Sequence, residues 1–206
     1  MQSWGVQSRW DIRDTGEEPS KSGIIGMIGC ALGYPMYDPR LKKLDEQLRM
    51  GVRINRSGKI LTDFHTVTGK LPKADQTRQL EERTIVSRRS YLLDASFLVV
   101  LEGPKLLVSE IAHAFSNPMW PIYLGRKSCP PTRPVFDCVK DEYDSLEEVL
   151  RRYDLPPSES SVSPNSKFKC IIEDKNGTAI RPDRLLNSPV RMYGNRNIRI
   201  EYIGCE

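Results

Sequence analysis

Apolar residues recur at helical spacing in four stretches of the chain. The longest is Ile24–Leu32, which follows Ser20-Lys21-Ser22 and stops at Gly33, so the pattern predicts a helix with serine caps at its start. The other predicted helices cover 41–48, 107–115 and 145–153. Glycine recurs at every third position within the first helix, and each glycine costs up to about 1 kcal/mol relative to alanine. We therefore expect this helix to pack closely against its neighbours or to receive a phosphate on its N-terminal amides.

Alternating apolar and polar residues predict strands over five short stretches. These are 51–55, 60–65, 95–101, 168–172 and 198–203. Residues 67–84 are polar and basic, so they are expected to form an exposed excursion, which carries binding more often than core. Beyond Pro134 the pattern changes to a capped helix, a loop rich in proline and serine over 155–165, and short strands. The chain is therefore predicted to be an α+β protein, with one main domain over 1–134 and a small β domain over 135–206.

The chain has 206 residues and a formal net charge of +4, with a sequence pI near 8.8. A chain of this length buries one substantial core, with or without a small satellite domain. The net charge favours nucleic acid as a partner but is too small to demonstrate it. The cations are grouped over 70–89, 126–133 and 181–199, whereas the acids gather over 137–148. This grouping is typical of a protein that holds an anionic polymer.

One stretch combines several features of a binding site. The apolar segment Ile122–Leu124 is followed by Gly125, Arg126, Lys127 and Ser128, and then by two prolines. The apolar segment can pair into a sheet, and the glycine allows backbone or ligand to approach closely. The two cations then present positive charge at the end of the strand, so we expect them to contact phosphates.

Residues for acid–base or metal chemistry are sparse. Five cysteines lie scattered without a C-x-x-C pair and only two histidines are present, so the pattern predicts reduced thiols, no metal and no cofactor. His65 is the sole plausible general base, and metal-free RNA cleavage could use it with Tyr91 or Lys127. A hydrogen-bonding or stacking role fits its place at a strand end better. No apolar run is long enough for a membrane span and no signal peptide is recognisable, which predicts a cytoplasmic protein.

Five segments occur in an order that resembles one known family. They are Gln2-Ser3-Trp4-Gly5, Pro19–Gly23 with the glycine-rich helix, Asp63–Val67, Arg89–Phe97 and Tyr123–Pro130. Together they resemble the CasD subunit of the type I-E CRISPR effector Cascade, from Met1 to about Pro134 and more weakly beyond. Each segment alone is a modest signal, whereas five in order are specific.

The resemblance implies a ferredoxin-like (RRM-like) domain with a protruding β-hairpin thumb at 67–84, followed by a small C-terminal β domain. It implies a non-catalytic subunit that binds and caps the 5′ handle of the guide RNA (crRNA) in antiviral defence. The implied partners are a repeated backbone subunit, a large subunit and, through the complex, target DNA in a prokaryotic cytoplasm. The related type I-C subunit cuts the precursor RNA itself, so a metal-independent endoribonuclease using His65 is the alternative. A generic RRM-like RNA-binding protein outside CRISPR systems is a third hypothesis.

The residues expected to touch RNA combine cations and hydroxyls for phosphates with rings for stacking. They are Trp4, Ser20, Lys21, Ser22, His65, Arg88, Arg89, Tyr91, Arg126, Lys127 and Ser128. The residues expected to contact a neighbouring subunit through the thumb are Lys70, Lys73, Arg78 and Arg83. The arginines over 181–199 are further candidates for binding a nucleic-acid backbone.

Members of this family carry an apolar strand before the Gln-x-Trp-Gly segment, and here Met1 directly precedes that segment. The first strand of a ferredoxin-like sheet is central. We therefore expect its two neighbours to present unpaired backbone groups, each costing about 1 to 3 kcal/mol if buried without a partner.

Overall fold

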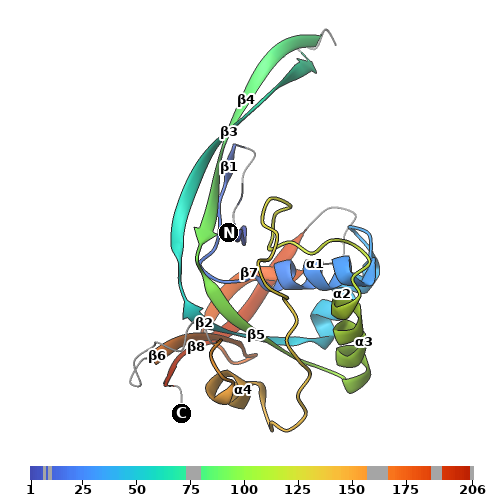
Figure 1. Cartoon of the computed structure of the whole chain (residues 1–206), viewed down its shortest axis with the longest axis vertical. Coiled ribbons are helices and arrows are strands. Elements are labelled where there is room, and N and C mark those ends of the chain that lie inside the picture. Colours follow the sequence, from blue (N-terminus) through green and yellow to red (C-terminus); the bar gives the residue numbers. More distant parts are fainter. Residues whose placement is uncertain (7, 9–10, 73–79, 157–166, 187–191, 205–206) are drawn as a thin grey trace.

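The computed structural model describes residues 1–206 except 7, 9–10, 73–79, 157–166, 187–191 and 205–206. Its described elements in chain order are β1 (Ile12–Arg13), α1 (Lys21–Leu32), α2 (Pro39–Gln47), β2 (Arg49–Arg56), β3 (Lys59–Pro72), β4 (Leu80–Leu93), β5 (Ser96–Glu102), α3 (Lys105–Ser116), α4 (Leu146–Arg152), β6 (Lys167–Glu173), β7 (Ala179–Leu185) and β8 (Tyr193–Gly204). The described strands form a five-stranded sheet in the body and a three-stranded sheet that projects from it (Figure 1).

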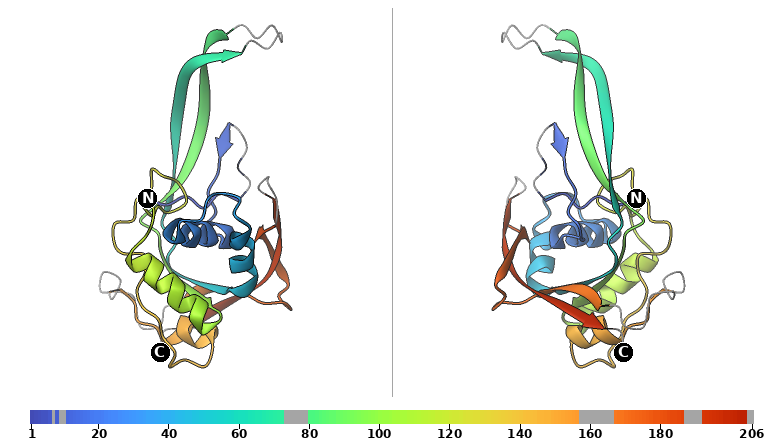
Figure 2. Two further views of the ribbon diagram at one scale, coloured as in Figure 1. Left: turned by 90° about the vertical axis from the view of Figure 1, so that its right-hand side faces the viewer. Right: turned by 90° about the vertical axis from the view of Figure 1, so that its left-hand side faces the viewer.

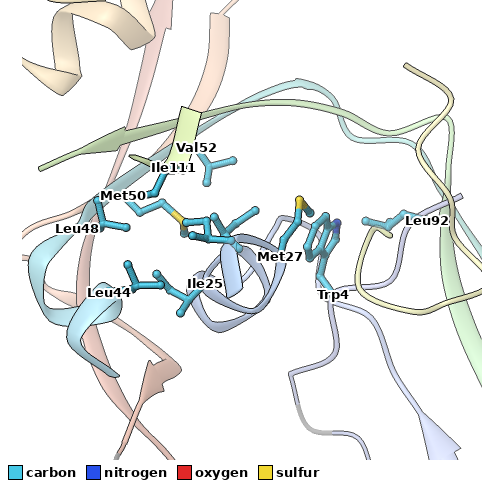
Figure 3. Close-up of a cluster of buried hydrophobic side chains, with 11 residues drawn as sticks. Trp4, Ile25, Met27, Leu44, Leu48, Met50, Val52, Leu92 and Ile111 are labelled. Carbon is cyan, nitrogen blue, oxygen red and sulfur yellow. The ribbon is translucent and has the colours of Figure 1, made fainter. Parts of the chain in front are cut away.

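The five-stranded sheet has the order β5-β2-β6-β8-β7, and all its pairs are antiparallel. One face carries the main core, which joins Ile25 of α1, Leu44 of α2, Met50 of β2 and Ile111 of α3 (Figure 3). On the other face α4 packs its Leu150 against the sheet. The predicted α+β class is confirmed, since α1, β2, β5 and α3 follow the helix–strand–strand–helix order of a ferredoxin-like unit. Within the described residues, no helix combines the length and apolarity needed to cross a membrane.

Helix α1 begins and ends where the sequence predicts. The hydroxyl of Ser20 caps its first turn, and Gly33 closes it with a φ of 73°, a left-handed conformation that favours glycine. A Cβ on Gly29 would lie only 2.4 Å from Leu41 Cδ2, so this glycine lets α2 approach closely. Gly26 has open space around it. Close packing therefore explains Gly29 and leaves Gly26 unexplained.

Strands β3 and β4 pair in continuous register over both strands and form the long hairpin that we call the thumb. Figure 2 shows it standing clear of the helices in two further views. Strand β1 adds to it, parallel to β4. The excursion predicted over 67–84 is only the outer part of this hairpin, because the strand predicted over 60–65 continues well past residue 65. The tip, 73–79, lies outside the described residues.

The region beyond residue 134 extends the same sheet. Strand β6 matches the predicted strand, and β8 contains the strand predicted over 198–203 but begins earlier, at Tyr193. Strand β7 was not predicted, because Pro182 and charged residues interrupt its apolar alternation. As an edge strand, β7 tolerates that proline. Strand β6 pairs directly with β2, so hydrogen bonding is continuous between the two parts. The division into 1–134 and 135–206 therefore stays a prediction, and most of the loop over 155–165 lies outside the described residues.

Strand β5 forms one edge of the five-stranded sheet. In the described part of the chain its only partner strand is β2, and Phe97–Leu101 are half-buried along the open edge. An open edge of this kind is where unpaired backbone groups are expected, and their number stays a prediction.

Candidate nucleic-acid interface

The basic loop, residues 121–131, folds as a tight turn. Leu124 N donates a hydrogen bond to Cys129 O (2.8 Å), and Ser3 N donates to Leu124 O (3.0 Å). Gly125 has a φ of 86°, and a Cβ there would lie 1.7 Å from the Ser3 carbonyl oxygen, so only glycine fits. The strand predicted at the start of this loop is therefore wrong, because its backbone groups bond within the turn and to the N-terminal segment.

Arg126 projects from the basic loop onto the base of the thumb. Its Nη1 donates to Ser90 O (3.1 Å), its Nη2 donates to the carbonyl oxygens of Arg13 and Asp14 (each 3.0 Å), and its guanidinium lies 4.9 Å from the centre of the Tyr91 ring. These acceptors are neutral carbonyls, so none of these bonds cancels the positive charge. Arg126 thus holds β1 against β4 and places a cation at the base of the thumb.

One face of the thumb continues this positive charge. Side chains paired across strands share a face, and Arg13 is paired with Arg89. Lys127 and Ser128 are exposed beside Arg126. We call Arg13, Arg89, Arg126 and Lys127 the basic surface; none of the four forms an ion pair with another described residue, although Asp63 lies across from Arg89. The sequence gives no sign of Arg13, because only the parallel pairing of β1 brings it here.

The opposite face of the thumb is apolar and exposed. It carries Ile12, Ile60, Phe64 and Val86, and Phe64 is 63% exposed. Arg88 lies across from Phe64 on this face, so the structure separates it from its sequence neighbour Arg89. We call Ile12, Ile60, Phe64 and Val86 the apolar thumb face. A surface of this kind on a monomer is typical of a docking site for another protein.

Lys21 does not belong to the basic surface. Its side chain is buried, with the residue only 1% exposed, and its Nζ donates to Asp45 O (2.7 Å) and Glu173 Oε1 (3.0 Å). The prediction that Lys21 presents charge to a phosphate is therefore wrong. Burial raises the pKa of the Asp45 carboxyl above its usual value, and the nearby Lys21 ammonium opposes that rise.

The N-terminus of α1 is occupied by an internal carboxylate. Asp183 Oδ2 accepts a hydrogen bond from Lys21 N (2.8 Å), and Arg196 donates to both oxygens of the same carboxylate (2.8 Å each). The carboxylate thereby satisfies an amide that the helix leaves free and lies at its positive end. The Asp183 carboxylate occupies the position that was predicted for a phosphate at Ser20 to Ser22. Ser22 itself is half-buried.

Two aromatic residues predicted to stack on bases lie in the interior. Trp4 is 3% exposed, packs in the main core, and donates through Nε1 to Gln2 Oε1 (3.0 Å) (Figure 3). Tyr91 is buried beneath Arg126. Neither ring faces solvent, so the prediction of a stacking role is wrong for both.

The arginines near the C-terminus are paired with carboxylates. Their ion pairs are Arg181 with Glu18 (2.7 Å), Arg184 with Asp45 (3.8 Å), Arg196 with Asp183 (2.8 Å) and Arg199 with Glu147 (3.2 Å). Residue 191 lies outside the described residues. The charge of the described arginines is therefore largely neutralised within the fold, and they are weak candidates for binding a nucleic-acid backbone.

Two of the four cations predicted for subunit contact lie in the described part of the thumb. Lys70 is paired across the hairpin with Glu82, and Arg83 Nε lies 3.4 Å from Glu81 Oε1. Both sites are exposed. Lys73 and Arg78 fall outside the described residues. Each of these two cations therefore lies beside an acid, which weakens it as a contact for a neighbouring subunit. The exposed residues of the apolar thumb face are better candidates for that contact.

His65 is half-buried on β3, beside the basic surface. Its Nδ1 is buried and has no hydrogen-bond partner among the described residues. The other histidine, His113, is exposed on α3. The described residues hold no group of three or more side chains that could bind a metal ion. This arrangement can hold phosphates.

A family model described as CRISPR-associated protein (Cas_Cas5) matches residues 1–199. This chain belongs to that family. It is 36% identical over 148 residues to the CRISPR system Cascade subunit CasD of Escherichia coli strain K12, and the match covers 66% of this chain and 65% of that protein. The match therefore spans just under two thirds of the relative's own length. The resemblance to the CasD family predicted from the five segments is confirmed.

Solved structures agree with this assignment. A chain of a CRISPR RNA-guided surveillance complex has a TM-score of 0.79 and 33% identity, and the match covers 99% of this chain and 86% of that chain. A second structure, a crystal structure of a Cas protein, has a TM-score of 0.70 and 30% identity, over 98% of this chain and 90% of that chain. The predicted ferredoxin-like fold is therefore confirmed.

Proposed function

We propose that the chain is a non-catalytic subunit of a Cascade-type CRISPR surveillance complex and that it binds the 5′ handle of the guide RNA. The observation that carries this proposal is the basic surface, where four cations meet at the base of the thumb without ion-pair partners among the described residues. Family membership and the likeness to a chain of an RNA-guided surveillance complex support it.

The geometry suits contact with a sugar–phosphate backbone. Arg13 and Arg89 lie side by side on paired strands, and Lys127 lies exposed beside the fixed guanidinium of Arg126. A single strand that crosses β1 and the basic loop would meet these cations in succession. Phosphate contacts of this kind fix the position of the RNA and carry no sequence information. Ser128 and His65 lie at the margin, where each can add a hydrogen bond.

The thumb provides the proposed contact with the other subunits. Its apolar face is exposed along both strands and at β1, and docking against a repeated backbone subunit would bury Phe64 and Val86. A large subunit and, through the assembled complex, target DNA are the further proposed partners, in the cytoplasm of a prokaryote. No cofactor is required by this function.

An endoribonuclease that uses His65 has less support. In-line attack of a ribose 2′-hydroxyl needs a positioned base and stabilisation of the leaving oxygen. Lys127 could supply the second, but Tyr91, the other candidate partner, is buried under Arg126. The non-catalytic assignment therefore ranks first.

The proposal is tested on complexes purified with co-expressed candidate subunits. Native mass spectrometry should find the chain together with one guide RNA, which is then sequenced and whose 5′ segment is synthesised. The affinity of the complex for this segment is measured against salt for the wild type and for Arg89→Ala, Lys127→Ala and the control Lys42→Ala. Lys42 is a half-exposed lysine on α2 that pairs with Glu46.

Each substitution in the basic surface should lower the slope of log K against log salt by about 0.7, the value for one lost phosphate contact with a single strand. Lys42→Ala should leave it unchanged. Slopes that stay equal in all variants would remove the basic surface from the RNA site, and absence of RNA from the complex would refute the function.

A further inference from the structure

A second site lies where the apolar thumb face meets the five-stranded sheet. The structure has an open cavity of about 540 Å³ there, within the range of sites that enclose small ligands. The ends of β2, β6 and β8 and the base of the thumb line it. The lining residues that bear on its chemistry are Glu17, Ile54, Ile60, Lys167, Lys169 and Tyr202.

The strand register shows what is unusual about this end of the sheet. Glu173 of β6 points to the face covered by α1, where it bonds Lys21. Residues of a strand alternate between faces, so Lys169 lies on the same face as Glu173, and Tyr202 is its partner on β8. Beyond the end of α1, this face therefore carries a lysine and a tyrosine in place of apolar residues that a helix would cover.

The cations at this cavity differ from the other cations of the C-terminal strands. Arg196 and Arg199 each bond a carboxylate within 3.2 Å, whereas Lys169 Nζ forms a longer ion pair, at 3.9 Å, with Glu17 Oε2 of the same cavity. Lys167 is exposed and makes no ion pair with a described residue. Lys167 therefore leaves positive charge available at the rim, where it can attract an anion, and Lys169 adds to it where Glu17 does not neutralise it.

Tyr202 presents an aromatic ring to this cavity. The residue is 66% exposed on β8, although it lies on the face of the sheet that elsewhere forms the core. Ile60, 62% exposed, stands on the thumb side of the same cavity. An exposed ring beside an aliphatic wall, with two lysines at the rim, is the combination that holds an unstacked base and its phosphate.

We propose that this cavity receives one unstacked nucleotide of the guide RNA. Its base stacks on Tyr202 and packs against Ile60, and Lys167 and Lys169 hold the flanking phosphates. The inference rests on the proposed RNA-binding function and adds a base-contacting site on the opposite face of the thumb from the basic surface. The strand then passes the base of the thumb and is held on both sides of it.

Abasic scanning of the 5′ segment of the co-purified guide RNA tests this site. One nucleotide at a time is made abasic, and each RNA is titrated with complexes carrying wild type, Tyr202→Ala, Tyr202→Phe or Tyr193→Ala. Tyr193 is an exposed tyrosine at the far end of β8 and serves as the matched control. Lys167→Ala is compared with Lys175→Ala, an exposed lysine outside the cavity. Thermal midpoints check that every variant is folded.

At one position the abasic RNA should bind wild type about tenfold more weakly, the size of one lost base stack. Tyr202→Ala should bind the intact RNA equally weakly and show no further loss at that position, while Tyr202→Phe and Tyr193→Ala should resemble wild type. Lys167→Ala, unlike Lys175→Ala, should lower the salt slope by about 0.7.

Two results would overturn the inference while leaving the proposed function intact. One is an RNA that binds the complex but whose abasic profile is the same in wild type and Tyr202→Ala. The other is a Tyr202→Ala variant that binds RNA normally but loses a protein partner from the complex, since the cavity then takes a protein segment. A wild-type complex without RNA would refute both proposals together.

Discussion

Replacing Lys21 by methionine separates a structural role for this lysine from the RNA-binding role that the sequence predicts. Methionine keeps much of the length and apolar bulk of the side chain and removes the ammonium. In the wild type that ammonium lies 2.9 Å from Glu173 Oε2 and 3.9 Å from Asp45 Oδ2. Without it, the two carboxylates face each other across a buried site with no cation between them.

Breaking a buried ion pair by removing one partner costs about 3 to 5 kcal/mol. For Lys21→Met we expect a loss of stability at the lower end of this range. The Glu173 side chain is 22% exposed, so water can solvate its charge, and Arg184 lies 3.8 Å from Asp45 and partly replaces the lost cation. A loss of about 3 kcal/mol lowers the thermal midpoint by roughly 6 to 12 °C in a domain of this size. Calorimetry of the purified protein measures it, with Lys42→Met as a control that should stay within about 0.5 kcal/mol of wild type.

The pH dependence gives a second measure of the same contact. Burial raises the folded-state pKa of Asp45. Protonated Asp45 therefore contributes most to the free energy of unfolding at low pH, and this contribution is lost as pH rises through the folded-state pKa. Removing Lys21 takes away an attraction that lowers this pKa. The deficit of Lys21→Met should therefore shrink on acidification, and adding Asp45→Asn should recover part of it. A variant that is as stable as wild type but has a lower salt slope for RNA would refute this reasoning.

Three further predictions concern other parts of the molecule. Hydrogen bonding to Arg49 lowers the pKa of Glu147, so wild type should lose stability as pH falls below about 4.3, and Glu147→Gln should flatten this acid limb in thermal melts. Deleting 70–83 should leave the thermal midpoint nearly unchanged and impair co-purification with the backbone subunit, whereas collapse of the midpoint would place that segment in the core. His65→Ala should change RNA affinity at most, and cutting of precursor RNA in chelator that this substitution abolishes would promote the endoribonuclease.

The helices could be predicted from the sequence because their signals are local. Helix α1 lies between its caps Ser20 and Gly33. Helix α4 begins after Ser145, whose hydroxyl accepts a hydrogen bond from Glu148 N (3.2 Å). The strand at Ile122–Leu124 failed for the opposite reason, since a short apolar run specifies a strand only where a neighbouring strand can pair with it. Here the N-terminal segment takes its hydrogen bonds instead.

The candidate site was predictable only in part. Arg126 and Lys127 were found because two cations follow a glycine in one loop, which is a local pattern. Lys21 has the same local appearance, a lysine between serines at a helix start, but its partner Glu173 is 152 positions away. No local pattern reveals such a pair, so a buried lysine and a phosphate-binding lysine look alike until the strands are assembled. Tyr202 was missed because its exposure depends on where α1 ends.

The carboxylate of Asp183 at the start of α1 also constrains how the chain is made. Until the ribosome has added β6 and β7, the first helix has neither Asp183 at its N-terminus nor Glu173 beside the Lys21 ammonium. A nascent chain that ends before these residues therefore leaves the α1 amide and a lysine without their native partners. Closing contacts across so long a stretch is slow, because the loop entropy must be overcome first. We expect the start of α1 to gain these contacts late, so a product truncated before Asp183 should be cleaved by proteases more readily than the full chain.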